Sequence, residues 1–354
     1  MVPFWSTPED LFPTAASQIS GTLPSVSKAY SFSICHHEPI NLTQSLWLLL
    51  LPASNSMFSR VFEGNRSRKK HCLGLLAWTY ELCPRVFLPP LQLLDLKLRI
   101  LLLSRIVRRR LSSAMIIEDD ADWDLNLRSM MEYFALGSQT LLDTSQDENK
   151  APRSPYGDGW DLLWFGHCAS STAEGDDRRV VIRNDPNVPP PEHRLNYGEV
   201  PNMSLYDNNT RIIFFSAGST CTYAYALSYR GAIKVLDYLA IDIFNQPVDF
   251  GLHDMCEKKD RGFKCISVFP QIFGDHKPAG SQDRDTDMTN RNITGVREKG
   301  FTYNTVHSTR LNSKHLIDGR TDLVENQYGK DPHLGEPISI EYRTGVEEGK
   351  LQSH

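Results

Sequence analysis

The sequence lacks a run of apolar residues long enough to cross a membrane as a helix, which takes about 18 residues or more. Residues 46–52 are too short, and residues 91–107 are interrupted by four charged side chains, Asp95, Lys97, Arg99 and Arg105. The N-terminus also lacks the basic start that is typical of a secretory signal peptide. A membrane anchor is therefore not visible in the sequence.

The chain also lacks an excess of positive charge and any C-x-x-C pair. Its net charge of −5 argues against a general nucleic-acid binder. The seven cysteines show neither a zinc ribbon nor a redox motif, and their spacing does not reveal which of them pair. Five N-x-S/T sequons, at Asn41, Asn65, Asn202, Asn208 and Asn292, are compatible with a secretory route.

With 354 residues the chain is long enough for a full hydrophobic core and two structural units. Residues 1–104 show no sustained periodicity over most of their length and are predicted to be atypical and poorly ordered. Residues 105–280 carry the alternating strands and helices of an α/β domain. Residues 281–354 are polar and charged, and a partly disordered C-terminal extension is expected there.

The most informative stretch is residues 114–124, in which a short apolar segment runs directly into five acids. Residues 114–117 are typical of a buried strand. The acids Glu118, Asp119, Asp120, Asp122 and Asp124 then follow at its carboxyl end, where open α/β sheets bind their ligands. Because so many like charges repel one another, a divalent cation with oxygen ligands is the favoured interpretation.

Three other interpretations of the acidic stretch can be weighed. A solvated turn with an aspartate capping the next helix would need only one acid. An EF-hand loop starting at Asp120 would need Gly at its sixth and Glu at its twelfth position, and these hold Leu125 and Met131, so it is rejected. The metal motif of a sugar-nucleotide transferase fits residues 118–120, although a lone short acidic motif is weak support.

Further elements follow from periodicity. Helices are predicted at residues 91–110, 125–142 and 230–239, and a short one near residues 311–323. Strands are predicted at residues 161–167, 211–217, 221–229 and 263–269, with the second and third of these paired to each other. Residues 170–205 contain five prolines and are predicted to be a long functional or disordered loop. The tail from residue 326 is predicted to be largely disordered.

Other candidate site residues follow these elements. Gly166 ends a strand and allows close approach of a ligand or of another strand. Asp249 precedes His253 and Asp254, and it would share a helix face with His253. His276, between Asp275 and Lys277, could complete a metal site. Each also has an ordinary structural interpretation: a strand-ending glycine, a helix-capping aspartate and a structural histidine.

The sequence resembles the family-25 glycosyltransferases, in particular their fungal members, which are related to lipooligosaccharide and procollagen galactosyltransferases. Five blocks in the family's order carry the resemblance: LSSAMIIEDDADWD at residues 111–124, WDLLWFGH at 160–167, STCTYAYAL with RGA at 219–232, PVD at 247–249 and PQIFGDH at 270–276. A weaker continuation runs through RLN at residues 310–312 to Asp322.

The resemblance implies a GT-A-like α/β fold with a mixed central sheet and inverting transfer of a hexose, typically galactose, from a UDP-sugar donor. It implies Mn²⁺ or Mg²⁺ held by Asp119 and Asp120, with His276 as a further ligand, and donor contacts that also include Glu118 and Gly166. Asp249 is the first candidate for the catalytic base and Asp254 the second. The acceptor would be a glycan, lipid or protein, and the family and the sequons point to the endoplasmic reticulum or Golgi.

The sequence departs from the family at its start. The family opens with a strand and loop of the form V-I-N-L-x-x-R-x-x-R that helps to bind the nucleotide, and residues 1–104 contain no match. We therefore expect a sheet without the family's first strand. A non-catalytic or truncated relative is the alternative to an enzyme. A phosphate-ester hydrolase is a third possibility, but no nucleophile stands beside the acids.

Overall fold

The structure, a computed structural model, describes residues 33–36, 47–49, 90–142, 152–195, 197–242, 246–258, 262–285, 295–329 and 337–344. Its α-helices are α3 (Pro90–Arg109), α4 (Leu127–Leu142), α5 (Tyr229–Leu236), α6 (Val248–Lys258) and α7 (Ser313–Ile317), and a π-helical segment, Asp237–Asp242, continues α5. None of the described helices is both long and apolar enough to cross a bilayer.

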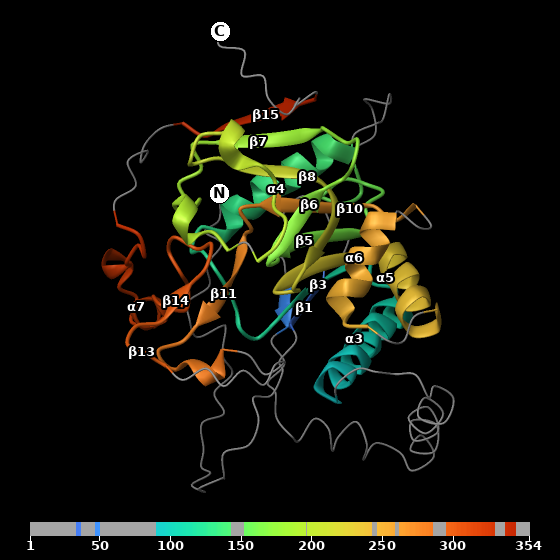
Figure 1. Ribbon diagram of the computed structural model, residues 1–354, viewed down its shortest axis with the longest axis horizontal. Coiled ribbons are helices and arrows are strands. Elements are labelled where there is room, and N and C mark those ends of the chain that lie inside the picture. The colour runs from blue at the N-terminus through green and yellow to red at the C-terminus, as the bar shows by residue number, and fades with distance from the viewer. Residues whose placement is uncertain are drawn as a thin grey trace, which may run out of the picture.

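One mixed sheet of ten strands organises the molecule (Figure 1). Its order is β15 (Ser339–Arg343), β7 (Arg179–Arg183), β8 (Arg211–Thr220), β10 (Cys265–Phe269), β5 (Leu162–Gly166), β9 (Ala224–Ser228), β3 (Ser113–Ile117), β1 (Ser33–His36) and β2 (Trp47–Leu49), and β6 (Ala169–Thr172) pairs beside β8. Strands β10 and β5 are parallel, whereas β9 is antiparallel to both β5 and β3. Strands β3, β5 and β10 therefore run in the same direction, and the predicted α/β class with a mixed sheet is confirmed.

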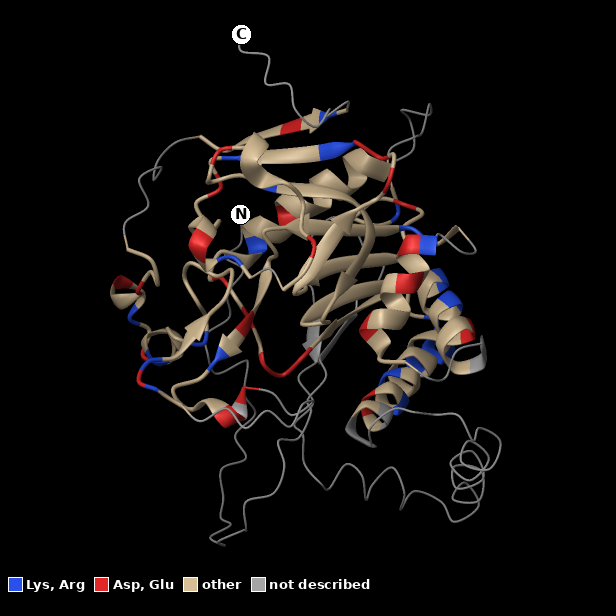
Figure 2. Cartoon of the chain, in the orientation of Figure 1, with Lys and Arg blue, Asp and Glu red and all other residues tan. Residues whose placement is uncertain are grey.

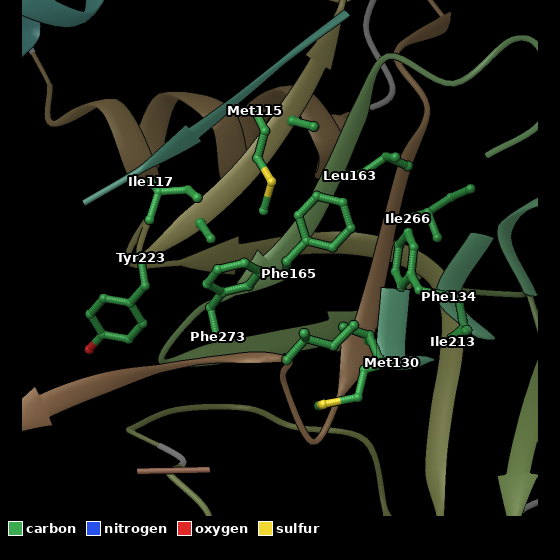
Figure 3. Close-up of a cluster of buried hydrophobic side chains, with 14 of the residues drawn as sticks. Met115, Ile117, Met130, Phe134, Leu163, Phe165, Ile213, Tyr223, Ile266 and Phe273 are labelled. Atoms are coloured by element: carbon green, nitrogen blue, oxygen red, sulfur yellow. The ribbon is translucent and has the colours of Figure 1, made fainter. Parts of the chain in front are cut away.

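Helices cover both faces of this sheet, because its strands alternate buried side chains between two cores. On one face Met115 and Ile117 of β3 belong to the same cluster as Phe134 of α4, which Figure 3 shows. On the other face Ala114 and Ile116 join a cluster that includes buried residues of α3, α5 and α6. The central strands are thus apolar on both sides, and their polar ends are the available places for a site.

Most of the predicted elements are present. Strand β3 follows helix α3, as the apolar segment at residues 114–117 and the helical pattern before it predict. Helices α4 and α5 and strands β5, β8, β9 and β10 lie within a few residues of their predicted bounds. In contrast, most of the atypical region at residues 1–104, including the basic run at residues 65–71, lies outside the described residues. Within that region, β1 pairs antiparallel with the outer edge of β3.

Two predictions were wrong. Residues 170–205 are not one long loop, because they contain β6 and β7, and β7 (RVVIR) is a largely buried strand that precedes the prolines. Strands β8 and β9 are not paired: β8 pairs with β7, β6 and β10, whereas β9 lies between β5 and β3. The tail beyond residue 326 includes β15, which pairs with β7 and whose Ile340 packs against the core.

The residues after 280 also pack on the main domain. A three-stranded sheet joins β14 (Phe301–Thr302), β11 (Phe273–Lys277) and β4 (Ala121–Trp123), and β12 (Gly280–Ser281) pairs with β13 (Val296–Arg297). Figure 1 shows β11, β13, β14 and α7 beside the end of the main sheet. The segment predicted to be a polar extension thus covers the strand that carries the acids.

Two disulfides connect elements around the central strands. Cys168 pairs with Cys221, 53 residues apart, and Cys256 of α6 pairs with Cys265 at the start of β10. The first links the residues after β5 to the segment between β8 and β9. The sequence could not predict these pairs, because spacing alone leaves the connectivity of cysteines open.

A buried histidine at the end of β5 makes stability depend on pH. His167 is fully buried; its Nε2 lies 2.9 Å from Val268 O, and its Nδ1 has no hydrogen-bond partner. Burial lowers the pKa of His167 from 6.5 to about 4. Between these values the unfolded chain binds a proton that the native protein rejects, so acidification through this window favours unfolding.

We therefore expect the free energy of unfolding to fall by roughly 3 kcal/mol between pH 6.5 and pH 4 from this residue alone. Denaturant unfolding across this range measures the effect. The matched variant His167→Gln keeps an N–H donor near Val268 O but does not titrate. Its stability should lack this component, and identical pH slopes for the two proteins would contradict the assignment.

Candidate functional site

The acidic segment lies at the carboxyl end of β3, as predicted. The backbone N–H of Glu118 donates to Tyr223 O (2.9 Å), which keeps the start of the segment beside β9. A turn then reverses the chain into β4, which pairs antiparallel with β11. Figure 2 shows the acidic segment in red below the end of the main sheet. Because the acids are spread over the end of β3, the turn and β4, each of them contacts a different part of the molecule.

Asp122 is a structural acid. It is fully buried, and its Oδ2 accepts hydrogen bonds from the hydroxyls of Thr302 (2.6 Å) and Ser308. Its Oδ1 accepts from the N–H groups of Trp123 (2.8 Å) and Arg310 (3.1 Å). Four donors satisfy the carboxylate, which leaves no oxygen for a metal ion. Asp122 therefore fastens residues 302–310 to β4.

Asp124 is structural as well. It is 1% exposed, and its carboxylate accepts from the N–H groups of Asn126 (3.0 Å) and His307 (2.6 Å). Helix α4 begins at Leu127, whose N–H donates to Asp124 O. The interpretation of the acids as a helix-capping turn thus describes Asp124 but not the whole segment.

Glu118 belongs to a partly buried charge network. Its Oε1 accepts from the Arg99 guanidinium and from the hydroxyl of Thr222 (2.6 Å). Arg99 is 4% exposed and also pairs with Asp95 at 2.9 Å. A carboxylate that already has an arginine partner is a poor candidate for a direct metal ligand. The structure thus favours a positioning role for Glu118 over the predicted donor contact.

Asp119 and Asp120 are the acids at the turn itself. Arg310 donates to the backbone oxygen of Asp119 and to Ala121 O (2.9 Å), which fixes the conformation of the turn. Asp120 keeps an exposed surface, so a solute can reach it, although protein atoms crowd its carboxyl. Its pKa is raised to about 7, first by burial and then by the charges of Glu118 and Asp275. Such an accumulation of negative charge favours a cation.

Asp275 of β11 is a carboxylate that the sequence prediction passed over. It is 4% exposed; its Oδ2 lies 2.7 Å from Lys277 Nζ and accepts from the Tyr223 hydroxyl (3.3 Å). Its Oδ1 is buried and has no hydrogen-bond partner. Burial raises the pKa of Asp275 although Lys277 opposes the change. The signal in the sequence was its place beside His276, in the block at residues 270–276.

His276 faces the other side of β11, because neighbouring residues of a strand point to opposite faces. Its Nδ1 lies 2.9 Å from Thr302 Oγ1 and 3.9 Å from Asp122 Oδ2. Since the Thr302 hydroxyl donates to Asp122, the His276 Nδ1–H donates to Thr302. Among the described residues no three His, Cys, Asp or Glu side chains form a group able to hold a metal. This holds for the predicted set of Asp119, Asp120 and His276 and equally for any set of three that includes Asp275, so the metal assignment stays a prediction.

The two candidate bases are placed very differently. Asp249 opens helix α6, and its Oδ2 accepts from the backbone N–H of Cys221 (3.2 Å). Asp254 lies one turn further along, where its Oδ2 accepts from Tyr238 (3.3 Å) and pairs with Lys258 (3.2 Å). The structure therefore joins Asp249, but not Asp254, to the segment after β8. His253, one turn after Asp249 as predicted, packs its ring against Gly218.

Gly166 is a packing glycine. A Cβ at this position would meet Phe273 Cβ at 2.9 Å and the backbone N of Ala224 at 3.0 Å. Any side chain would therefore separate β5 from β9 and β11. Of the two roles that the sequence allowed for Gly166, close approach of another strand is the one observed, and the predicted donor contact has no support in this packing.

Residues 221–223 connect the scattered acids. The N–H of Cys221 donates to Asp249, the hydroxyl of Thr222 donates to Glu118, and the hydroxyl of Tyr223 donates to Asp275. In Figure 3 the Tyr223 ring lies at the margin of the core cluster with its hydroxyl directed away from it. The Cys168–Cys221 disulfide anchors this tripeptide. Sequence reasoning missed these roles because each depends on contacts between distant segments.

A hollow of about 190 Å³ lies elsewhere on the molecule. Leu141, Arg178, Phe215 and Cys265 are among the residues that line it; Asp176 is its one acid, and none of the acids of residues 118–124 takes part. It faces the end of α4 and the β6–β7 connection, and its lining carries no cluster of carboxylates. The hollow is thus separate from the acidic segment and offers no obvious chemistry.

Comparison with protein-family models, with curated proteins and with solved structures finds no match to this chain. The assignment of a function therefore depends on the sequence blocks and on the geometry around residues 221–223.

Proposed function

We propose that this protein is a metal-dependent glycosyltransferase resembling family 25, with a GT-A-like fold, which transfers a hexose from a UDP-sugar to an acceptor hydroxyl with inversion. Galactose is the first candidate for the hexose. One observation carries the proposal: residues 221–223 hydrogen-bond to Glu118, Asp249 and Asp275. These acids come from different sequence blocks of the resemblance, and the fold gathers them near the end of β3.

The proposed roles follow from the surroundings of each acid. Asp119 and Asp120, at the exposed turn, would hold Mn²⁺ or Mg²⁺ near the donor diphosphate. The donor set fits such an ion, because carboxylate oxygens suit hard cations and Asp275 Oδ1 is a buried oxygen without a partner. When bound, the ion neutralises charge that develops on the diphosphate. Arg310 fixes the backbone of the turn, and Glu118 is positioned by Arg99 and Thr222.

Asp249 is the better candidate for the base that removes the proton from the acceptor hydroxyl. Its carboxylate is half-buried and is oriented by the Cys221 N–H and by its own neighbour, Phe250 N (3.0 Å). Neither contact neutralises the charge, so the oxygen remains able to accept a proton. Asp254, in contrast, is paired with Lys258.

The proposal is tested by titrating the full chain with UDP-galactose in a calorimeter, with and without MnCl₂. We expect binding with Mn²⁺ that is weakened by at least about tenfold when EDTA removes the ion, because the ion links two negatively charged groups. UDP-glucose and free UDP serve as controls for the sugar and the nucleotide. No heat of binding for UDP-galactose in either condition would contradict the proposal.

A non-catalytic relative is the second candidate, and the position of the hollow favours it. The hollow of about 190 Å³ is not lined by the acids. Such a protein would keep the sheet and its cores but would not bind the donor. The same titration distinguishes the two functions, because a folded protein that binds neither Mn²⁺ nor UDP-galactose would be the non-catalytic relative.

The two disulfides agree with a secretory route for either function. Disulfides persist in oxidising compartments and are rare in reducing ones. Two of the five sequons, at Asn202 and Asn208, lie at exposed positions, where a glycan could attach without disturbing the core. We therefore propose the endoplasmic reticulum or Golgi as the place where the protein acts.

A further inference from the structure

We propose that Asp275, and not His276, completes the divalent-cation site with Asp120. The proposal rests on the proposed function, because it names a ligand at the same site. It begins from the orientation of β11: Asp275 and Lys277 lie on the face toward Tyr223, whereas His276 lies on the face toward Thr302 and Asp122.

Asp275 is a buried carboxylate with one oxygen that lacks a hydrogen-bond donor, as expected of a metal ligand in the absence of its ion. Its side chain is 5% exposed, and one of its two oxygens has no donor. A buried carboxylate oxygen without a partner costs free energy, so such oxygens are uncommon unless a ligand satisfies them. Asp275 pairs with Ala121 across β11 and β4, and the backbone N–H of His276 donates to Asp120 O (3.0 Å), so Asp120 and Asp275 belong to directly adjoining backbone segments.

Lys277 supports the same assignment. Its ammonium lies 2.7 Å from Asp275 Oδ2 and also acts on Asp120, so it is the positive charge that balances the carboxylates of this face. Lys277 also donates a hydrogen bond to Asp285 O (3.1 Å). It would keep this hydrogen bond if a divalent ion displaced its ammonium from Asp275. A bound cation and the lysine would repel each other. Lys277 is thus expected to weaken metal binding.

His276 is committed to another network. Its Nδ1–H donates to Thr302, whose hydroxyl donates to Asp122, and these two hydrogen bonds connect β14 to β4. A ligand set of Asp120 and Asp275 supplies only carboxylate oxygens, which suits Mn²⁺ and Mg²⁺. The site would then need no imidazole.

The test is direct Mn²⁺ binding to the full chain, measured by calorimetry and by the loss of the free Mn²⁺ signal in electron paramagnetic resonance. Asp275→Asn should weaken binding by about 10-fold or more. Lys277→Gln should strengthen it by about 5-fold or more, because the change removes a positive charge that repels the divalent ion. His276→Asn keeps an N–H near the position of Nδ1, removes Nε2, and should leave the affinity within about twofold.

Each outcome decides. Weakening in His276→Asn with an unchanged Asp275→Asn would overturn the proposal and leave the transferase function standing. No Mn²⁺ binding by the wild type would overturn it as well, and metal-free turnover of UDP-galactose would then show that sugar transfer survives but that its proposed dependence on a metal does not. The expected pattern of Mn²⁺ affinities without any UDP-galactose binding would support the site and reject the transferase. Near-UV circular dichroism checks that each variant is folded. If Asp275→Asn is not folded, the Lys277→Gln variant is the deciding test. An Mn²⁺ affinity that does not increase in Lys277→Gln would then overturn the proposal.

Discussion

Replacing Asp249 with asparagine is expected to lower kcat for galactosyl transfer by about 10²- to 10⁴-fold, the usual contribution of a positioned general base. The amide can still accept a hydrogen bond from Cys221 N–H, so the fold should survive, but it cannot take the acceptor proton. Affinity for UDP-galactose should change by less than about threefold, because the proposed base acts on the acceptor side. Steady-state kinetics and donor titration measure both quantities.

Asp254→Asn is the matched control, because the same change is made one helical turn away. Asp254 is tied to Tyr238, Gln246 and Lys258, and its pair with Lys258 is partly exposed, so it contributes at most about 1 kcal/mol to stability. The control should keep kcat within about threefold of wild type, since it loses no group that contacts substrate. If it loses as much activity as Asp249→Asn, the base has been misassigned.

Replacing Asp185 with alanine is expected to lower the free energy of unfolding by about 3–5 kcal/mol, because it leaves the Arg211 guanidinium buried without its counter-charge. The side chains of this pair are each 1% exposed, and Arg211 Nε lies 2.7 Å from Asp185 Oδ2. Arg211 also donates to backbone oxygens of Asn187 (3.0 Å) and Gln271 (3.1 Å). The loss would therefore disturb the start of β8 and the turn before β11 together.

Glu132→Ala provides the control for this second prediction. Glu132 pairs with Arg128 on the exposed face of α4, where the side chains are 65% and 77% exposed. Such a pair contributes about 0.3–0.5 kcal/mol. Chemical denaturation of both variants should separate them by several kcal/mol at pH 7. Equal small losses would mean that water or a shift of the backbone relieves the buried arginine.

The central strands could be predicted because apolar runs such as residues 114–117 and 211–217 permit few other structures. The order of the strands could not be, since it depends on which buried faces meet in space. Strand β7 was missed because Pro186 and its neighbours made the surrounding stretch resemble a loop. Strand β15 was missed because its alternation is weak and only its pairing with β7 makes it a strand.

The position of the acids at the end of β3 followed from the sequence, but their separate roles did not. Asp120 and Asp122 are the same residue type two positions apart, and only the segment at residues 302–310 makes Asp122 structural. Asp275 was overlooked in favour of His276 because a histidine beside acids resembles a metal ligand. The face of β11 on which each of them lies could not be known before β11 was seen to pair with β4.

The Cys168–Cys221 bridge has a topological consequence. With the chain between its two ends, it closes a covalent ring that contains β6, β7 and β8 and that begins and ends beside the tripeptide at residues 221–223. Strands β7 and β8, which lie next to the edge strand β15, are thus tethered at both ends of the ring to the neighbourhood of the acids. Local unfolding of β15 and β7 can therefore separate these strands from the sheet, but the disulfide keeps both ends of the ring beside residues 221–223.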